Sequence, residues 1–236
     1  MRYTASGGRN GERMGKRGNA VLAMTVIREI QRNNPEKGLV ALEKLISQKP
    51  DEPALLNLKG VCLDMLGRHE ESLILYERVL AADDNPAIYW NNKGLALQNL
   101  GRFLEAETAY RVALEREPES FEAIYNLANT LQSLEQYDEA LNLYNQALDI
   151  RPDHILVLLN KGNALASMKR YDEAVECYME LLDIKPDFPD ATYNLAHTYE
   201  EMEKNDEAKT WYLRTLEIDP AYHHASEQLS LLVQKK

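Results

Sequence analysis

The chain contains 236 residues, of which 44% are hydrophobic, and it carries a formal net charge of −11 at pH 7. This composition is ordinary for a folded, water-soluble protein, and no apolar run approaches the length that spans a bilayer, so we expect no membrane partner. The first 18 residues carry a charge of +4 and the remainder carries −15. An acidic body of this kind argues against nucleic acid as the main ligand, because phosphate binding requires a basic surface.

The N-terminal segment, residues 1–18, is basic and rich in Gly and Arg. It lacks the apolar centre of a secretory signal, so we expect a cytoplasmic protein. We interpret the segment as a disordered leader. Contact of this segment with an acidic partner or with RNA is the alternative.

After the leader, four columns of residues recur with a period of 34. The aromatic column contains Tyr76, Tyr110, Tyr144, Tyr178 and Tyr212. The column of small residues contains Gly60, Gly94, Ala128, Gly162 and Ala196. The other two columns contain Leu80, Leu114, Leu148, Leu182 and Leu216, and Pro50, Pro118, Pro152, Pro186 and Pro220. A fixed period of this length indicates an array of one small unit, stacked in a line.

Each unit reads as two helices. In residues 87–120, apolar and small side chains recur every three or four positions on both sides of Gly101, which predicts two amphipathic helices. Gly101 suits the left-handed turn that ends a helix, and Pro118 ends the second helix. The connection is short, so the two helices must be antiparallel. We expect Gly94 and Ala106 to let their backbones approach closely.

The turns and helix starts carry two further signals. Asp138, Asp172 and Asp206 precede the small residue of the second helix, and each is expected to cap that helix. Pro53, Pro86 and Pro189 suit first-turn positions. The hairpin glycines are replaced in three later units, where we expect strained turns at Glu135, Lys169 and Glu203.

We therefore predict an all-α solenoid of six units followed by one helix. The units are residues 19–52, 53–86, 87–120, 121–154, 155–188 and 189–222. The first is degenerate, because it lacks the small-residue signature. Residues 223–236 are predicted to form a C-terminal capping helix with one apolar side and one polar side.

The repeat resembles the tetratricopeptide repeat, and the resemblance covers about residues 19–236. In one unit it rests on Trp90, Gly94, Leu97, Ala106, Tyr110 and Pro118, which match the spacing of that family. The resemblance implies a right-handed superhelix in which the first helix of each hairpin lines the concave side. It also implies recognition of a protein or peptide.

An asparagine row is the best candidate for a binding site. Asn92, Asn126, Asn160 and Asn194 lie one period apart in the first helices, and Asn129 and Asn163 lie three residues further on. In the family this face is the wall of the groove. An amide both donates and accepts, so a row of amides could hold a peptide backbone. Tyr125, Tyr193 and His197 would supply the neighbouring surface. The alternative is that the amides serve hydrogen bonds between helices.

The charges on these helices restrict the partner. Some members of the family hold a C-terminal carboxylate with Lys and Arg in the groove. Here the corresponding faces offer Glu122, Asp190, Glu200 and Glu201. We therefore expect a basic or neutral ligand rather than a chaperone carboxylate.

No catalytic, metal or cofactor motif stands out. The five His residues show no helical metal-site spacing, and no phosphate-binding glycine loop or nucleophile motif occurs. Cys62 and Cys177 are expected to be buried thiols rather than a disulfide or a metal site. We therefore predict a non-enzymatic scaffold that binds a peptide or protein segment in the concave groove and needs no cofactor. A structural module that homodimerises through its terminal repeat or its cap is the alternative.

Overall fold

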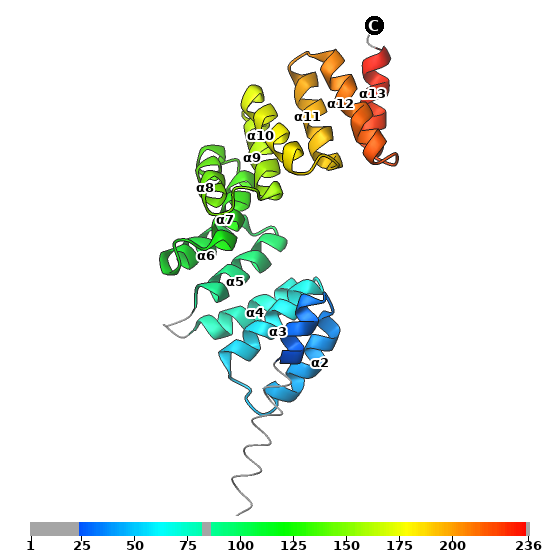
Figure 1. The fold of residues 1–236 in the computed structure, drawn as a ribbon. Coiled ribbons are helices and arrows are strands. Elements are labelled where there is room, and N and C mark those ends of the chain that lie inside the picture. Colours follow the sequence, from blue (N-terminus) through cyan, green and yellow to red (C-terminus); the bar gives the residue numbers. More distant parts are fainter. Residues whose placement is uncertain (1–23, 82–85, 235–236) are drawn as a thin grey trace, which may run out of the picture. The chain divides into compact units, whose positions relative to one another are not determined.

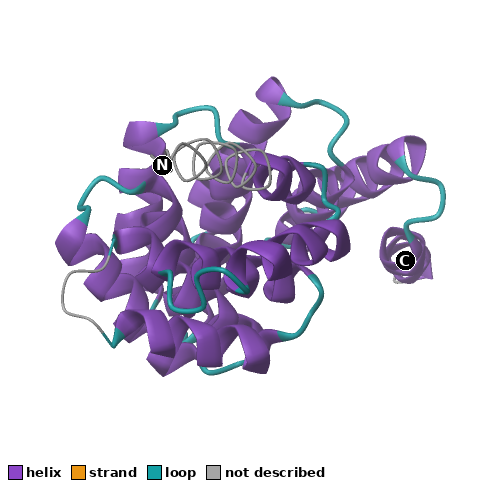
Figure 2. Ribbon diagram, turned by 90° about the horizontal axis from the view of Figure 1, so that it is seen from below, coloured by secondary structure: helices purple, strands orange, loops and turns teal. Residues whose placement is uncertain are grey.

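The computed structural model describes residues 24–81 and 86–234. Every regular element in these residues is an α-helix, as Figure 2 shows, which confirms the predicted all-α fold. The chain divides into two compact units, Met1–Glu117 and Pro118–Lys236. The predicted leader, residues 1–18, and the first residues of the degenerate unit lie outside the described residues.

The first unit is a series of helices in which each packs on the next. Residues 24–31 are helical. The helices that follow are α2 (Pro35–Ile46), α3 (Pro53–Met65), α4 (His69–Leu80), α5 (Ala87–Asn99) and α6 (Phe103–Arg116). Contacts join α3 to α4 and α5 to α6 as hairpins, and α4 to α5 between hairpins (Figure 1). Packing is therefore between neighbours in the chain, as in a repeat array.

The second unit contains three hairpins and a last helix. Its helices are α7 (Phe121–Ser133), α8 (Tyr137–Ile150), α9 (Ile155–Ser167), α10 (Tyr171–Ile184), α11 (Pro189–Glu201), α12 (Asn205–Ile218) and α13 (His223–Gln234). Successive helices again lie side by side (Figure 1). The last helix, α13, packs on α12 through Ala225 and Leu232, which are buried.

The core is built around the tyrosine column. All five column tyrosines are fully buried, with relative exposures of 0–1%. In three hairpins the small-residue column is Gly, and a Cβ at Gly60, Gly94 or Gly162 would come within 2.5–2.6 Å of the ring of the tyrosine sixteen residues later. Sequence reasoning assigned Gly94 to close approach of helix backbones. The structure instead shows that this glycine makes room for a tyrosine ring.

The hairpin turns repeat one geometry. At each turn the backbone N–H three residues past the helix donates to a carbonyl five residues back, as Arg102 N–H does to Leu97 O at 2.9 Å. This arrangement ends the helix with one residue in the left-handed region. Gly67 and Gly101 hold that position with φ of 72° and 73°, and Glu135, Lys169 and Glu203 hold it with φ of 60°, 62° and 59°. The three predicted strained turns are confirmed.

The predicted helix caps are wrong. The second helices begin one residue before Asp138, Asp172 and Asp206, and none of these helices has a side-chain cap hydrogen bond. Each Asp therefore lies in the first turn, where its charge favours the positive end of the helix dipole. Pro53 and Pro189 occupy first-turn positions as predicted, whereas Pro86 precedes the first residue of α5.

Candidate functional site

The asparagine row lies on the first helices of successive hairpins. Asn92 is on α5, and Asn126, Asn160 and Asn194 are on α7, α9 and α11; all four side chains are half-buried. In the first unit, Asn92 Nδ2 donates to Asn57 Oδ1 at 3.0 Å, which links α5 to α3. The row therefore makes contacts between neighbouring repeats.

In the second unit the row becomes a ladder of amides. Asn160 Nδ2 donates to Asn129 Oδ1 at 2.9 Å and to the Tyr125 hydroxyl at 3.0 Å. One repeat later, Asn194 Nδ2 donates to Asn163 Oδ1 at 2.8 Å. The two predicted asparagine columns are thus paired across the junctions α7–α9 and α9–α11.

The ladder is tied to the tyrosine column. The Tyr144 hydroxyl donates to Asn129 Oδ1 at 2.7 Å and lies 2.6 Å from Gln132 Oε1. The Tyr178 hydroxyl donates to Asn163 Oδ1 at 2.8 Å. Each of the two amide oxygens therefore accepts two hydrogen bonds from inside the protein, which holds its side chain in one orientation.

These bonds use only one end of each amide. In the described part of the chain, no protein atom bonds to Nδ2 of Asn129 or Asn163, nor to Oδ1 of Asn160 or Asn194. None of these four atoms is buried, because the buried side-chain atoms without a partner in the described residues are Trp90 Nε1 and His154 Nδ1. The ladder thus presents donors and acceptors whose orientation is set by its internal bonds. The amides therefore bridge repeats, as the structural interpretation expects, and they keep accessible atoms. That they bind a peptide stays a prediction.

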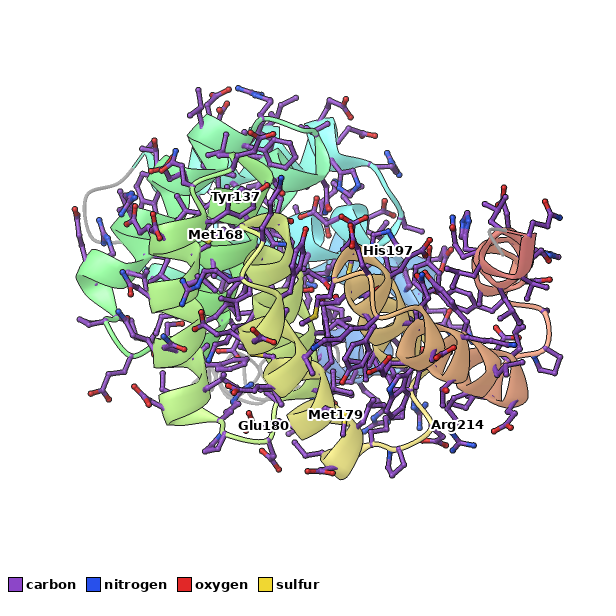
Figure 3. All side chains as sticks on the ribbon, turned by 90° about the horizontal axis from the view of Figure 1, so that it is seen from above. Tyr137, Met168, Met179, Glu180, His197 and Arg214 are labelled. Carbon is purple, nitrogen blue, oxygen red and sulfur yellow. The ribbon has the colours of Figure 1, made fainter. Side chains whose placement is uncertain are left out.

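A cleft of about 370 Å³ lies beside the ladder between α9, α10 and α11. It is lined by Asn163, Ala166, Ser167, Tyr171, Tyr178, Asn194, His197, Thr198 and Glu201. Three of these, Asn163, Asn194 and His197, are predicted site residues. Figure 3 shows His197 near the end of the hairpins where Met168 follows α9, while Met179 and Glu180 of α10 lie towards the other end. The structure therefore brings these three predicted residues together in one cleft of the second unit.

Sequence reasoning placed the Glu201 charge on this face but missed Ser167, Tyr171 and Thr198 of the cleft. The Tyr171 hydroxyl donates to Glu201 Oε2 at 3.4 Å. Burial and, secondly, the Glu201 carboxylate raise the pKa of Tyr171. The sequence did carry a signal for the cleft itself. Positions 64, 98, 132, 166 and 200 lie one period apart, and Ala166 is the one small residue among Asp64, Gln98, Gln132 and Glu200.

The remaining predicted site residues lie in aromatic groups. Tyr125 packs against Phe121 and His154, with ring centroids 6.1 Å and 5.7 Å apart. Tyr193 lies 5.1 Å from Tyr222 and 6.3 Å from His197 between ring centroids. Burial, followed by the charges of Glu200 and Glu227, raises the pKa of Tyr193. Tyr193 and His197 therefore extend the cleft surface towards α13.

The thiols and the grouping of possible metal ligands can be described for residues 24–81 and 86–234. Cys62 and Cys177 are free and buried, and burial raises the pKa of each thiol to about 11. Within residues 24–81 and 86–234, no three His, Cys, Asp or Glu side chains are grouped so as to hold a metal ion. In the same residues, no helix combines the length and the apolar character needed to cross a membrane.

Family models of the tetratricopeptide repeat match nearly all of the described chain. One matches residues 24–86, a second matches 85–153 and 119–187, and a third matches 165–229. The chain belongs to the tetratricopeptide repeat family. Members of this family serve as protein-interaction scaffolds, and this chain is a scaffold of that kind. No curated protein sequence matches it.

Solved structures agree with this assignment of the fold. The tetratricopeptide repeat protein YrrB is 23% identical, with a TM-score of 0.67 over 80% of this chain and 97% of YrrB. MamA from Desulfovibrio magneticus is 19% identical, with a TM-score of 0.68 over 72% of this chain and 96% of that one. The Cut9–Hcn1 structure gives a TM-score of 0.78 at 16% identity over 91% of this chain and 42% of that one.

Proposed function

We propose that this tetratricopeptide repeat protein binds an extended peptide segment along the first helices of its second unit. The single observation that carries the proposal is the amide ladder. Its internal bonds leave Nδ2 of Asn129 and Asn163 and Oδ1 of Asn160 and Asn194 accessible. A peptide backbone alternates donors and acceptors, so fixed amides that offer both can hold it without reading its side chains.

Preorganisation supports this assignment. A flexible Asn must lose rotamer freedom when it binds a ligand, which costs about 0.5–1.5 kcal/mol for each immobilised side chain. Asn163 is already held by Tyr178 and by Asn194. The ladder can therefore bind a backbone with little further ordering. YrrB, which has the same fold, is a protein "with an unusual peptide-binding site", and this is consistent with such a role. Binding of this kind requires no catalysis, and we propose that the protein is not an enzyme.

A variant that separates binding from folding is Asn129→Ala. Both partners of Asn129 keep another hydrogen bond, because Tyr144 retains Gln132 and Asn160 retains Tyr125. The change should therefore alter stability little while it removes an accessible donor. The matched control is Asn142→Ala with Asn145→Ala, since both side chains are exposed on the second helix α8.

The experiment selects binders of the full chain from a displayed random-peptide library and measures their dissociation constants by fluorescence anisotropy. We expect Asn129→Ala to weaken the selected peptides at least about tenfold, which is about 1.4 kcal/mol, and the control pair to leave them unchanged. If the control pair weakens binding and Asn129→Ala does not, the peptide binds at the exposed side of α8 and the proposal is wrong. Failure to select any peptide would also contradict it.

Self-association is a second candidate, favoured by one observation. The terminal hairpin and the last helix expose Leu213, Leu231 and Val233, with relative exposures of 45%, 44% and 52%. Large apolar side chains at the end of a repeat array can pair two copies. Light scattering of the full chain tests this: we expect a concentration-dependent dimer that Leu231→Glu with Val233→Glu removes. A monomer at all concentrations would exclude it.

A further inference from the structure

We infer that the cleft between α9 and α11 is a subsite for a basic side chain of the bound peptide, with arginine favoured over lysine. The inference rests on the proposed function, since it names the chemistry of one ligand residue at the same face. The residues that define this subsite are Asn163, Ala166, Ser167, Asn194 and Glu201, all of which line the cleft.

The cleft exists because one side chain is small. In the other hairpins that contain a tyrosine of the column, the side chain twelve positions before the tyrosine accepts a hydrogen bond from the tyrosine hydroxyl. These contacts are Asp64 to Tyr76 at 2.8 Å, Gln98 to Tyr110 at 3.0 Å, Gln132 to Tyr144 at 2.6 Å and Glu200 to Tyr212 at 2.9 Å. At the corresponding position before Tyr178 the chain has Ala166. The space that a longer side chain would fill is therefore open.

The groups around this space are mainly hydrogen-bond acceptors. Among the described residues, the Glu201 carboxylate has no cationic partner, and its one hydrogen bond comes from the Tyr171 hydroxyl at 3.4 Å. Asn194 donates inward through Nδ2, so its Oδ1 is available to accept. The Ser167 hydroxyl donates to Asn163 O at 3.0 Å, which leaves its oxygen free to accept. Beside the accessible donor Nδ2 of Asn163, one negative charge and two neutral acceptors thus line the cleft.

This set of acceptors matches a guanidinium group. Arg has five N–H donors spread over a plane and no acceptor, whereas the Lys ammonium is a compact charge with three donors. A carboxylate or phosphate ligand would be repelled by Glu201. The neighbouring cation Arg170 is engaged by Glu173 at 2.6 Å through two hydrogen bonds, so it does not neutralise the cleft.

The subsite can be tested without knowing the peptide. The probe is N-acetyl-arginine amide, titrated into the full chain labelled with ¹³C in its alanine methyl groups and followed by NMR. The Ala166 methyl lines the cleft, and its resonance is assigned by its loss in Ala166→Gln. We expect a saturable shift of this resonance, a weaker one with N-acetyl-lysine amide, and none with N-acetyl-citrulline amide, which has the same shape without the charge.

Two variants and a control complete the experiment. Glu201→Gln should weaken the arginine probe at least tenfold, and Glu180→Gln should leave it unchanged, because Glu180 is exposed towards the other end of α10 (Figure 3). Ala166→Gln should lower the affinity for a selected peptide at least tenfold. Asn129→Ala should lower it as stated under the proposed function. If Ala166 shows no shift, or shifts equally with citrulline, the subsite is wrong even where peptides still bind. If the probe binds but no peptide is selected, the subsite stands and the backbone-binding proposal fails.

Discussion

At the scale of single residues, the two accepting asparagines of the ladder, Asn129 and Asn163, differ in how their partners are supported. Asn129 shares each partner with a second acceptor, since Tyr144 also meets Gln132 and Asn160 also meets Tyr125. Asn163 is the one acceptor that the described residues offer to Asn194 Nδ2, and it also accepts from the Tyr178 hydroxyl. Removing a hydrogen-bond partner lowers the free energy of unfolding most where no other group takes its place.

We therefore expect Asn163→Ala to lower the free energy of unfolding by about 1–3 kcal/mol and Asn129→Ala by less than about 1 kcal/mol. Urea denaturation followed by circular dichroism measures both. Adding Ala166→Gln to Asn163→Ala should recover part of the loss, because Gln would reach the Tyr178 hydroxyl as Gln132 reaches Tyr144. Equal losses for the two single variants would contradict the assigned partners.

The left-handed residues give a second prediction at this scale. Lys169 has φ of 62°, a conformation that is strained for a residue with a Cβ and unstrained for Gly. Lys169→Gly should raise the free energy of unfolding by up to about 1 kcal/mol. The control is Lys185→Gly, because Lys185 has φ of −134° and gains nothing from Gly. A thermal melt with no difference between the two variants would argue against strain at Lys169.

At the scale of the hairpin, each second helix has a small residue where it packs on the first helix, and the size of this residue limits how closely the two helices approach. Ala140 and Ala174 are fully buried. Ala140→Leu should overpack the α7–α8 hairpin and lower the free energy of unfolding by about 1–3 kcal/mol. Asn142→Leu, at an exposed position of the same helix, is the control and should change stability little. Unchanged melting of Ala140→Leu would show that this junction has room to spare.

The second helices of three hairpins also begin with the same ion pair. Arg68, Arg102 and Arg170 each form two hydrogen bonds to a Glu three residues later, with distances of 2.6–2.7 Å. The hydrogen bonds from Arg102, more than its charge, lower the pKa of Glu105 below its ordinary 4.5. A lowered folded-state pKa means that the pair stabilises the fold above that ordinary value and loses this contribution as the pH falls through the folded pKa.

We expect Glu105→Gln to be slightly less stable than the wild type at pH 7, since the pair is exposed and screened by solvent. The difference should shrink as the pH falls below the ordinary 4.5 and through the lowered folded-state pKa of Glu105. Urea denaturation at several pH values measures it, and Glu115→Gln is the control, because Glu115 is exposed without an ion pair in the described residues. A difference that persists unchanged at pH 3 would show that the carboxylate is not the stabilising group.

At the scale of the whole molecule, the chain divides at Glu117 and Pro118. The second unit contains the amide ladder, the cleft and the last helix, and its helices contact their own neighbours. We expect the fragment 118–236 to fold alone, with a helical circular dichroism spectrum and a cooperative melt, because repeat arrays are stabilised by contacts between neighbours. An unfolded fragment would show that the first unit is required.

The sequence alone was enough to predict what depends on local spacing. The period of 34 residues defined the tyrosine column, and all five of its rings are buried in the structure. The replaced glycines predicted the left-handed turns at Glu135, Lys169 and Glu203. These features follow from helical periodicity and from allowed backbone angles, which act over a few residues. The cytoplasmic location and the leader, which we expect from the composition of residues 1–18, stay predictions.

Only the tertiary structure decided how the asparagines are used. The bond from Asn194 to Asn163 joins residues 31 positions apart, so it depends on how two helices are placed to within a fraction of an ångström, and no spacing rule sets that. The same placement put Tyr rings over Gly94 and left Ala166 beside an open cleft. Hydrogen-bond partners and empty space are properties of packed surfaces rather than of a repeating pattern, and the candidate binding site is made of both.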